Sequence, residues 1–169
     1  MIDLCNGIYT REEKYVKKKV AVTAVALAIS MILCGCGEDP ELTKFKKDFE
    51  DFCINLSALD TSINNIDAQS ETATDELLKY IDQLEDEFAD LAEMDFPEEF
   101  DYLEEVADQA SEYMTEAANS YHTAYEGDSF QENYSDYAYK NYKRAYKRIQ
   151  IILIYLHGEE PQDEDLLSE

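Results

Sequence analysis

The spacing of apolar residues is the feature that most constrains this sequence. From Leu42 to Ile66, apolar side chains recur at alternating intervals of three and four residues, and similar spacing returns three more times along the chain. This interval places them along one side of an α-helix, which has to be buried against other helices. Five glycines and three prolines in 169 residues leave few turns for a many-stranded β fold. The sequence therefore predicts an all-α protein.

The predicted helices cover residues 41–66, 72–93 and 97–126, and a fourth runs from a capping box at Ser129–Glu132 to Gly158. Tyr134, Tyr142, Ile149 and Ile152 are among the predicted core residues of the fourth helix. Because the connections are short, sequential helices are expected to be antiparallel neighbours. The expected architecture is an up-down-up-down antiparallel four-helix bundle, and the alternative is a three-helix domain with one loosely packed helix.

Charge excludes one large class of partners. The chain carries 39 Asp and Glu against 14 Lys and Arg, a net charge of −25. Nucleic acid would be repelled over most of such a surface, so no nucleic-acid partner is expected. A hydrophobic content of 45%, with 12% aromatic residues, is also too high for a disordered acidic chain. The sequence therefore predicts a folded domain that works with other kinds of partner.

The N-terminal region has the features of an export signal. Three lysines at 17–19 precede an apolar run of 14 residues, Val20 to Leu33, which is short for a membrane-spanning helix and typical of a signal peptide. The run ends in Leu33-Cys34-Gly35-Cys36. This string resembles the lipobox of bacterial lipoproteins, and the resemblance covers residues 16–36 only. It implies cleavage after Gly35, lipid attachment at Cys36, and a location on the extracytoplasmic face of the cell membrane.

The predicted organisation follows from that resemblance and from the helical pattern. Residues 1–35 are the signal peptide, 36–40 the lipid anchor and a short linker, 41–158 the bundle, and 159–169 an acidic tail. Residues 1–15 carry three acidic side chains, which are unusual in a signal peptide, and a start at Val16 from a GUG codon would exclude them. An uncleaved short anchor or a buried helix is the alternative to the signal peptide.

The short linker predicts how the bundle stands at the membrane. The start of the first helix, the turn at Phe96 and the end of the last helix would lie near the lipid. After cleavage, Cys53 would be the only cysteine besides Cys36, so no disulfide framework or metal cluster is possible, and Cys53 is expected to be a small buried hydrophobe.

Tyrosine is concentrated near the C-terminal half of the predicted bundle, with nine residues between 113 and 155. Tyr125, Tyr137 and Tyr139 lie toward the turn at Gly127, away from the predicted membrane side. Tyrosine buries a large area with few rotatable bonds and is common at contact surfaces. These residues are either a surface for a ligand or protein, or ordinary tyrosines that flank the helix seam with their hydroxyls in water.

The end of the last helix is apolar on nearly every face from Ile149 to Leu156. A four-helix bundle buries one stripe of a helix, so Ile151, Ile154 and Tyr155 are predicted to lie outside the core, where they could contact a protein or a second copy. The alternative is that the linker or the tail covers them. Between residues 140 and 148, five basic side chains either pair with acids of the preceding helix or form a docking strip for an anionic partner.

The predicted activity is binding, and no catalytic residue, cofactor or metal site is expected. The histidines lack the Glu-x-x-His spacing of di-iron bundles, and no phosphate loop or nucleophile pattern occurs. The expected partner is an envelope protein or an exported polypeptide. Two alternatives are a surface protein that buffers divalent cations, through acids such as Asp101, Glu105, Asp108 and Glu112, and a hydrolase of wall glycan.

Overall fold

The structure, a computed structural model, describes residues 39–127 and 129–161. The helices are α2 (Pro40–Asn64), α3 (Ala73–Ala92), the 3-10 helix η1 (Glu98–Leu103), α4 (Glu104–Tyr125) and α5 (Glu132–Leu156). The described residues contain no strand, so the predicted all-α class is confirmed. The predicted signal peptide, Cys36 and most of the predicted tail lie outside the described residues.

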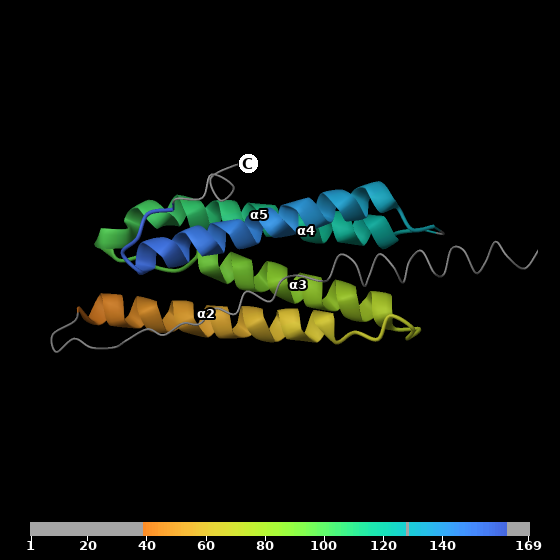
Figure 1. Cartoon of the computed structure of the whole chain (residues 1–169), viewed down its shortest axis with the longest axis horizontal. Helices are drawn as coiled ribbons and strands as arrows, with labels where there is room; N and C mark the ends of the chain where they lie inside the picture. Colours follow the sequence, from red (N-terminus) through yellow and green to blue (C-terminus); the bar gives the residue numbers. More distant parts are fainter. Residues whose placement is uncertain (1–38, 128, 162–169) are drawn as a thin grey trace, which may run out of the picture.

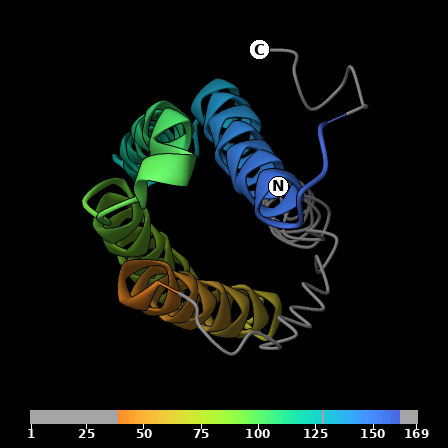
Figure 2. The same ribbon diagram turned by 90° about the vertical axis from the view of Figure 1, so that its left-hand side faces the viewer.

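The four long helices run alternately up and down, each antiparallel to the one before (Figure 1). Seen from one end, their ribbons follow an arc in the order α2, α3, α4, α5 (Figure 2). The closest backbone packing is between α4 and α5, followed by α3 with α4 and α2 with α3. The predicted up-down-up-down bundle is therefore confirmed, with α2 packed along α3.

Alanine explains why α4 and α5 approach so closely. Six alanines that are fully buried lie on the two helices, and each is small enough to let the opposite backbone come near. They are Ala107, Ala110, Ala117 and Ala124 on α4, and Ala138 and Ala145 on α5. Met114 fills the space between the alanines of α4.

The core of the other half of the bundle is made of larger side chains. Predicted core positions of α2 and α3 are buried at Phe45, Phe49, Phe52, Leu56 and Ile63, and at Leu77, Ile81, Leu84, Phe88 and Leu91. The rings of Phe52 and Phe88 meet edge to face with their centroids 5.7 Å apart. Burial of these stripes supplies most of the stabilisation, because hydrophobic burial is the dominant favourable term in folding.

Local chemistry sets the ends of the helices. Asp39 caps α2, since its Oδ1 accepts a hydrogen bond from the backbone N–H of Glu41 at 3.0 Å. The chain leaves α5 through Gly158, at φ +75°, and the N–H of Glu159 donates to the carbonyl of Ile154 at 3.1 Å. This is the bond pattern of a Schellman turn, which needs a left-handed residue and favours glycine there. The predicted end at Gly158 is confirmed.

The third predicted helix begins differently from the prediction. Its first six residues after Pro97 form the 3-10 helix η1, and the α-helical part starts only at Glu104. In a 3-10 helix every third residue is aligned, which puts Pro97, Phe100 and Leu103 on one side. Pro97 and Leu103 are buried and Phe100 is half-buried against the core. The tighter helix thus buries this segment on the bundle.

The predicted capping box at Ser129 is wrong. Helix α5 begins at Glu132, after Gln131, and no side chain caps it. Gln131 instead binds the end of α4: its backbone N–H donates to the carbonyl of Ala124 at 2.8 Å, and its side-chain amide donates to the carbonyl of Thr123 at 2.9 Å. This contact holds the start of α5 in an orientation that leaves Tyr134 46% exposed rather than in the core.

Candidate interaction surfaces

The two ends of the bundle are composed as the sequence predicts. The anchor end, as we name it, consists of the start of α2, the segment between α3 and η1, and the end of α5; the distal end holds the α2–α3 turn and the turn at Gly127 (Figure 1). Cys36 lies outside the described residues, four positions before Pro40, where α2 begins. The covalent chain therefore ties Cys36 to the anchor end.

At the distal end, the predicted tyrosines separate into two groups. Tyr121 is buried, and burial raises the pKa of its hydroxyl, with smaller contributions from Tyr125 and Tyr139 beside it. Tyr125 packs against Phe130, with ring centroids 5.1 Å apart, and Lys143 lies over the Tyr139 ring at 5.8 Å. Both Tyr125 and Tyr139 are half-buried. These two residues therefore lie near Tyr121 and are partly covered by the fold.

Tyr137 belongs to the second group. Its side chain is 47% exposed, and that of Tyr134, one turn earlier on α5, is 46% exposed. Sequence reasoning placed Tyr134 in the core, although its interval of four from Phe130 was a sign of irregular packing. The exposed tyrosines of the distal end are thus Tyr134 and Tyr137, and we call them the distal tyrosine pair.

The three residues predicted to lie outside the core near the end of α5 differ in their environments. Ile151 is buried, with 6% of its surface exposed, so its predicted exposure is wrong. It lies one turn after Arg148, on the side of α5 from which Arg148 reaches α4. Ile154 is half-buried, and half-buried Tyr155 meets the exposed ring of Tyr102 edge to face at 5.4 Å. Tyr102 was missed because the contact joins residues far apart in sequence.

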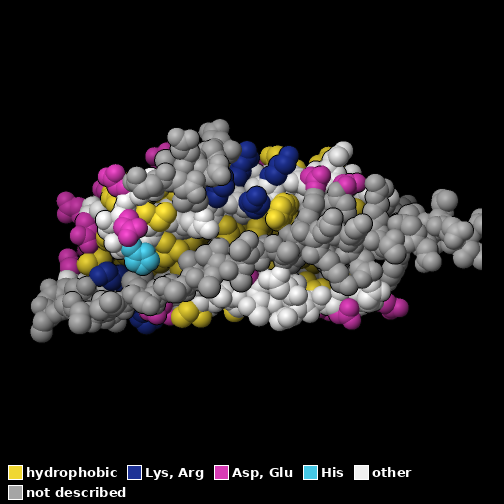
Figure 3. Space-filling view, viewed as in Figure 1, with side chains coloured by type: hydrophobic (Ala, Val, Ile, Leu, Met, Phe, Trp, Pro, Cys, Tyr) yellow, Lys and Arg dark blue, Asp and Glu magenta, His cyan; other side chains and the backbone are white. Residues whose placement is uncertain are grey.

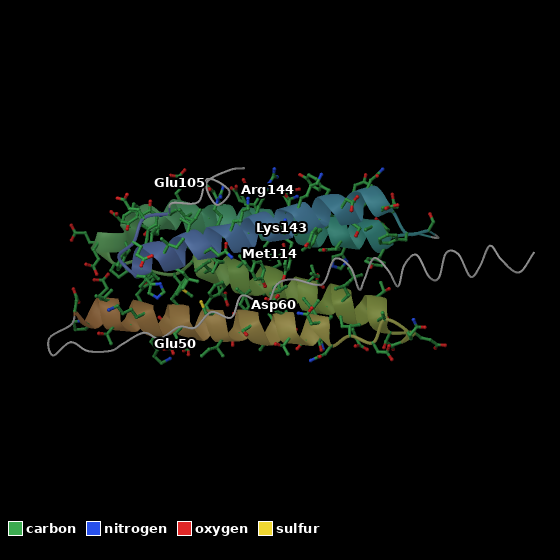
Figure 4. The ribbon with its side chains drawn as sticks, viewed as in Figure 1. Glu50, Asp60, Glu105, Met114, Lys143 and Arg144 are labelled. Atoms are coloured by element: carbon green, nitrogen blue, oxygen red, sulfur yellow. The ribbon has the colours of Figure 1, made fainter. Side chains whose placement is uncertain are left out.

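A polar cluster that sequence reasoning missed connects α2 to α5. The hydroxyls of Tyr142 and Tyr146 both donate to Oδ1 of Asp60, each at 2.6 Å, and their rings stack with centroids 4.6 Å apart. Both tyrosines are buried, including Tyr146, which lay outside the predicted core stripe. Burial raises the pKa of the Asp60 carboxyl, and the two tyrosine hydrogen bonds lower it in part. Figure 4 shows Asp60 on α2, across from α5, which carries both of its partners.

A second polar cluster connects α5 to α4. Arg144 and Arg148 both lie over the ring of Tyr113, each with its guanidinium carbon 5.5 Å from the centroid. The Nε of Arg148 donates to Oε1 of Gln109 at 2.8 Å, and Nη1 of Arg144 donates to Oδ1 of Asn141 at 3.2 Å. We call Arg144 and Arg148 the arginine pair. The contacts that the structure shows from this pair to α4 are with an aromatic ring and a neutral amide.

Asn141 is the least satisfied group of this cluster. It is 1% exposed, and its Nδ2 has no hydrogen-bond partner in the part of the chain that the structure describes. A buried amide N–H that lacks a hydrogen-bond partner lowers the stability of the fold. The unpaired Nδ2 of Asn141 is therefore a destabilising feature of the α4–α5 interface.

The predicted cation-binding acids and the other candidate residues lie elsewhere on the molecule. Asp101, Glu105, Asp108 and Glu112 are exposed along η1 and α4, and no group of three or more acidic, His or Cys side chains among the described residues is arranged to hold a metal ion. At the distal end, Nε2 of His122 lies 2.6 Å from Oδ1 of Asp82 and joins α4 to α3. Cys53 is buried, as predicted, and burial raises the pKa of its thiol to about 12.

Among the described helices, none is long and apolar enough to cross a membrane. Comparisons with protein-family models, with curated proteins and with solved structures found no match to this chain.

Proposed function

We propose that this protein is an exported lipoprotein, anchored at Cys36 on the extracytoplasmic face of the cell membrane, and that its helical bundle acts by binding another protein of the envelope or an exported polypeptide. The observation that carries the proposal is the sequence Leu33-Cys34-Gly35-Cys36, which follows a basic and then an apolar run and directly precedes the bundle. The whole helical domain would then stand outside the cell.

The anchor would hold the bundle in one orientation. Pro40 follows Cys36 by four positions, so the start of α2 lies within about 14 Å of the lipidated residue. Helix α5 has 25 residues and, at about 1.5 Å per residue, extends roughly 37 Å from the anchor end to the distal end. The distal tyrosine pair would therefore be presented well away from the bilayer.

Binding is favoured over other activities by what the distal end displays. Tyr134 and Tyr137 expose nearly half of their surfaces in a rigid helix, where little conformational entropy is lost when a partner covers them. At the same end, Tyr125 packs against the core and against the ring of Phe130. Exposed tyrosines of this kind are suited to contact with the surface of another protein.

The lipid anchor is tested by metabolic labelling with an alkyne analogue of palmitate in the native host. Wild-type protein should carry the label and migrate as the processed form. Cys36→Ser should leave an unlabelled precursor, whereas Cys34→Ser and Cys53→Ser should keep the label. Persistent labelling of the Cys36→Ser variant would show that Cys36 is not the lipid attachment site.

The binding activity is tested by placing a photoreactive phenylalanine derivative at Tyr137 and exposing living cells to light. Cross-links from this position to one defined envelope or exported protein are expected, identified by mass spectrometry. Tyr102 is the matched control, because it is a tyrosine of similar exposure, 52%, at the anchor end. Equal cross-linking of the same protein from both positions, or none from Tyr137, would contradict a distal binding surface.

A further inference from the structure

A strip of aromatic and basic side chains runs along the outer side of α5. Tyr137, Lys140 and Arg144 stand three and four positions apart, which places them on one side of the helix, and Tyr134 precedes Tyr137 by one turn. Tyr142, on the opposite side of α5, is buried in the core. The two outer tyrosines and Lys140 are exposed, and Arg144 is half-buried. We call the four outer residues the aromatic–basic strip.

The strip is positively charged on a molecule that is otherwise acidic. The chain after Cys36 has nine basic and 36 acidic side chains. Lys and Arg side chains gather over α5 in the space-filling view (Figure 3), and Arg144 lies on the side of α5 that is away from α2 (Figure 4). Among the described residues, no acidic side chain forms an ion pair with Lys140 or Arg144. The charge of these two residues is therefore available to an anionic partner.

The fold holds the guanidinium group of Arg144 in one orientation. Its carbon lies 5.5 Å from the centroid of the Tyr113 ring, and its Nη1 donates to Oδ1 of Asn141 at 3.2 Å. A guanidinium group has five N–H donors and binds a carboxylate through two parallel hydrogen bonds. Within the described part of the chain, Asn141 accepts from one of these donors, so an oriented set of donors is left for a carboxylate. Such preorganisation lowers the entropy that is lost on binding.

Asn141 contributes to this orientation and lowers the stability of the fold. It is 1% exposed, and its Nδ2 has no hydrogen-bond partner among the described residues. A buried donor without a partner is destabilising, and natural proteins keep such local conflicts mainly at functional sites. An apolar side chain at this position would avoid the unpaired donor but would remove the acceptor of Arg144. Asn141 is thus a positioning residue for Arg144.

The spacing of the strip selects the shape of its partner. Lys140 and Arg144 are four residues apart, which is about 6 Å along the helix. In an extended peptide, alternate side chains lie about 6.6 Å apart on the same side, so carboxylates two positions apart match the two cations. Tyr134 and Tyr137 continue the strip by roughly 9 Å toward the distal end. Their rings offer apolar surface to the next side chain on that side of the peptide.

A long polyanion or an anionic bilayer matches the strip less well than a short peptide segment does. Each of these presents negative charge over an area much larger than two cations, and the acidic surroundings would repel the remainder. Glu112 and Glu116, for example, are exposed on α4 within one turn of Tyr113. A short segment avoids most of this repulsion, because charges more than about 8 Å apart are largely screened at physiological ionic strength.

We propose that the aromatic–basic strip recognises an extended acidic segment of a protein partner, with two carboxylates two positions apart and an apolar side chain beyond them. Lys140 and Arg144 bind the carboxylates, and the distal tyrosine pair covers the apolar side chain. The inference rests on the proposed function, because it names the chemistry of the partner that the distal end binds.

Fluorescence anisotropy with the purified full chain tests this recognition, using two synthetic peptides as probes. The acidic probe alternates valine with glutamate and ends in phenylalanine, and the neutral probe has glutamine in place of each glutamate. The protein should bind the acidic probe at least tenfold more tightly than the neutral one. Lys140→Gln with Arg144→Gln should remove this preference, whereas Lys79→Gln, at an exposed position of α3, should keep it.

Asn141→Leu separates positioning from packing. This variant should bind the acidic probe at least threefold more weakly and the neutral probe equally well. Its melting temperature should stay equal or rise, because the unpaired donor is gone. A purely structural role would leave the preference for the acidic probe intact, and that result would contradict the assignment of Asn141 as a positioning residue.

The proposal is overturned if the two probes bind equally, if inorganic polyphosphate or phosphatidylglycerol vesicles bind the strip more tightly than the acidic probe, or if the probe preference is unchanged in the double variant. It is also overturned if sedimentation shows that the strip instead joins two copies of this chain.

The cellular experiment distinguishes this proposal from the proposed function. Lys140→Gln with Arg144→Gln should lower cross-linking from the photoreactive residue at Tyr137 at least fivefold. Unchanged cross-linking would overturn the acidic chemistry of the partner and leave binding at the distal end intact. No cross-linking in any background, together with a retained preference for the acidic probe, would contradict the proposed function alone.

Discussion

Single residues decide how α2 and α5 are held together. These helices lie at the two ends of the arc, and the hydrogen bonds that the structure shows between them run through Asp60 (Figure 2). One carboxylate oxygen serves two tyrosine hydroxyls, which would otherwise be buried donors without acceptors. The charge of Asp60 and its capacity to accept hydrogen bonds therefore have opposite effects on stability, and substitution can separate them.

Asp60→Asn keeps an acceptor for both hydroxyls and removes the buried charge, so its free energy of unfolding at pH 7.5 should stay within about 1 kcal/mol of wild type. Asp60→Ala removes the acceptor and should cost about 1–3 kcal/mol, because two buried hydroxyls lose their partner. Urea unfolding monitored by circular dichroism measures both. An alanine variant as stable as wild type would show that the hydroxyls find other acceptors.

At the scale of helices, the intervals of three and four were sufficient to predict the elements and their buried stripes. Phe49, Phe88 and Met114 are buried where periodicity puts them, because a helix fixes which residues share a side. The ends were harder to predict. The η1 segment and the start of α5 depend on competing local hydrogen bonds, such as those of Gln131 to the end of α4, which a pattern of apolar residues does not contain.

The polar clusters were missed for a different reason. Asp60 is separated from Tyr142 by more than 80 positions, and nothing in either local sequence says that α2 and α5 will face each other. Arg144, Arg148 and Tyr113 were visible as residue types, but their meeting depends on the register between α4 and α5. That register is set by alanine packing, and sequence spacing alone does not determine it.

At the scale of the whole molecule, the acidic excess opposes the compact state. A net charge of −25 creates repulsion among exposed carboxylates such as those of η1 and α4, and this repulsion weakens as they are protonated or screened. The raised pKa of Asp60 acts in the same direction. A group whose pKa is raised by folding binds its proton more tightly in the folded state, so stability increases as the pH falls through that pKa.

The melting temperature should therefore rise when the pH is lowered from 8 toward 5, and it should also rise at pH 8 when NaCl is increased from 20 to 500 mM. Differential scanning calorimetry measures both effects. Asp60→Asn should show a smaller gain with acid but the same gain with salt, because it removes one titrating group and leaves the repulsion between surface charges. Melting that is flat or falls over this range would contradict the electrostatic account.

The path of the chain through the bundle also has a mechanical consequence. If a lipid holds α2 at the anchor end while a partner pulls on the distal end, the load runs parallel to the helix axes. Helix α2 would then slide along its axis past α3. This sliding is resisted by all the buried side chains of α2 at once, because they would have to leave the core together; they include Phe45, Phe49, Phe52 and Leu56. The same pull applied to the other end of α2 would peel it from α3 one turn at a time. Tethered at the start of α2, the antiparallel helices would thus convert tension on the protein into shear between α2 and α3.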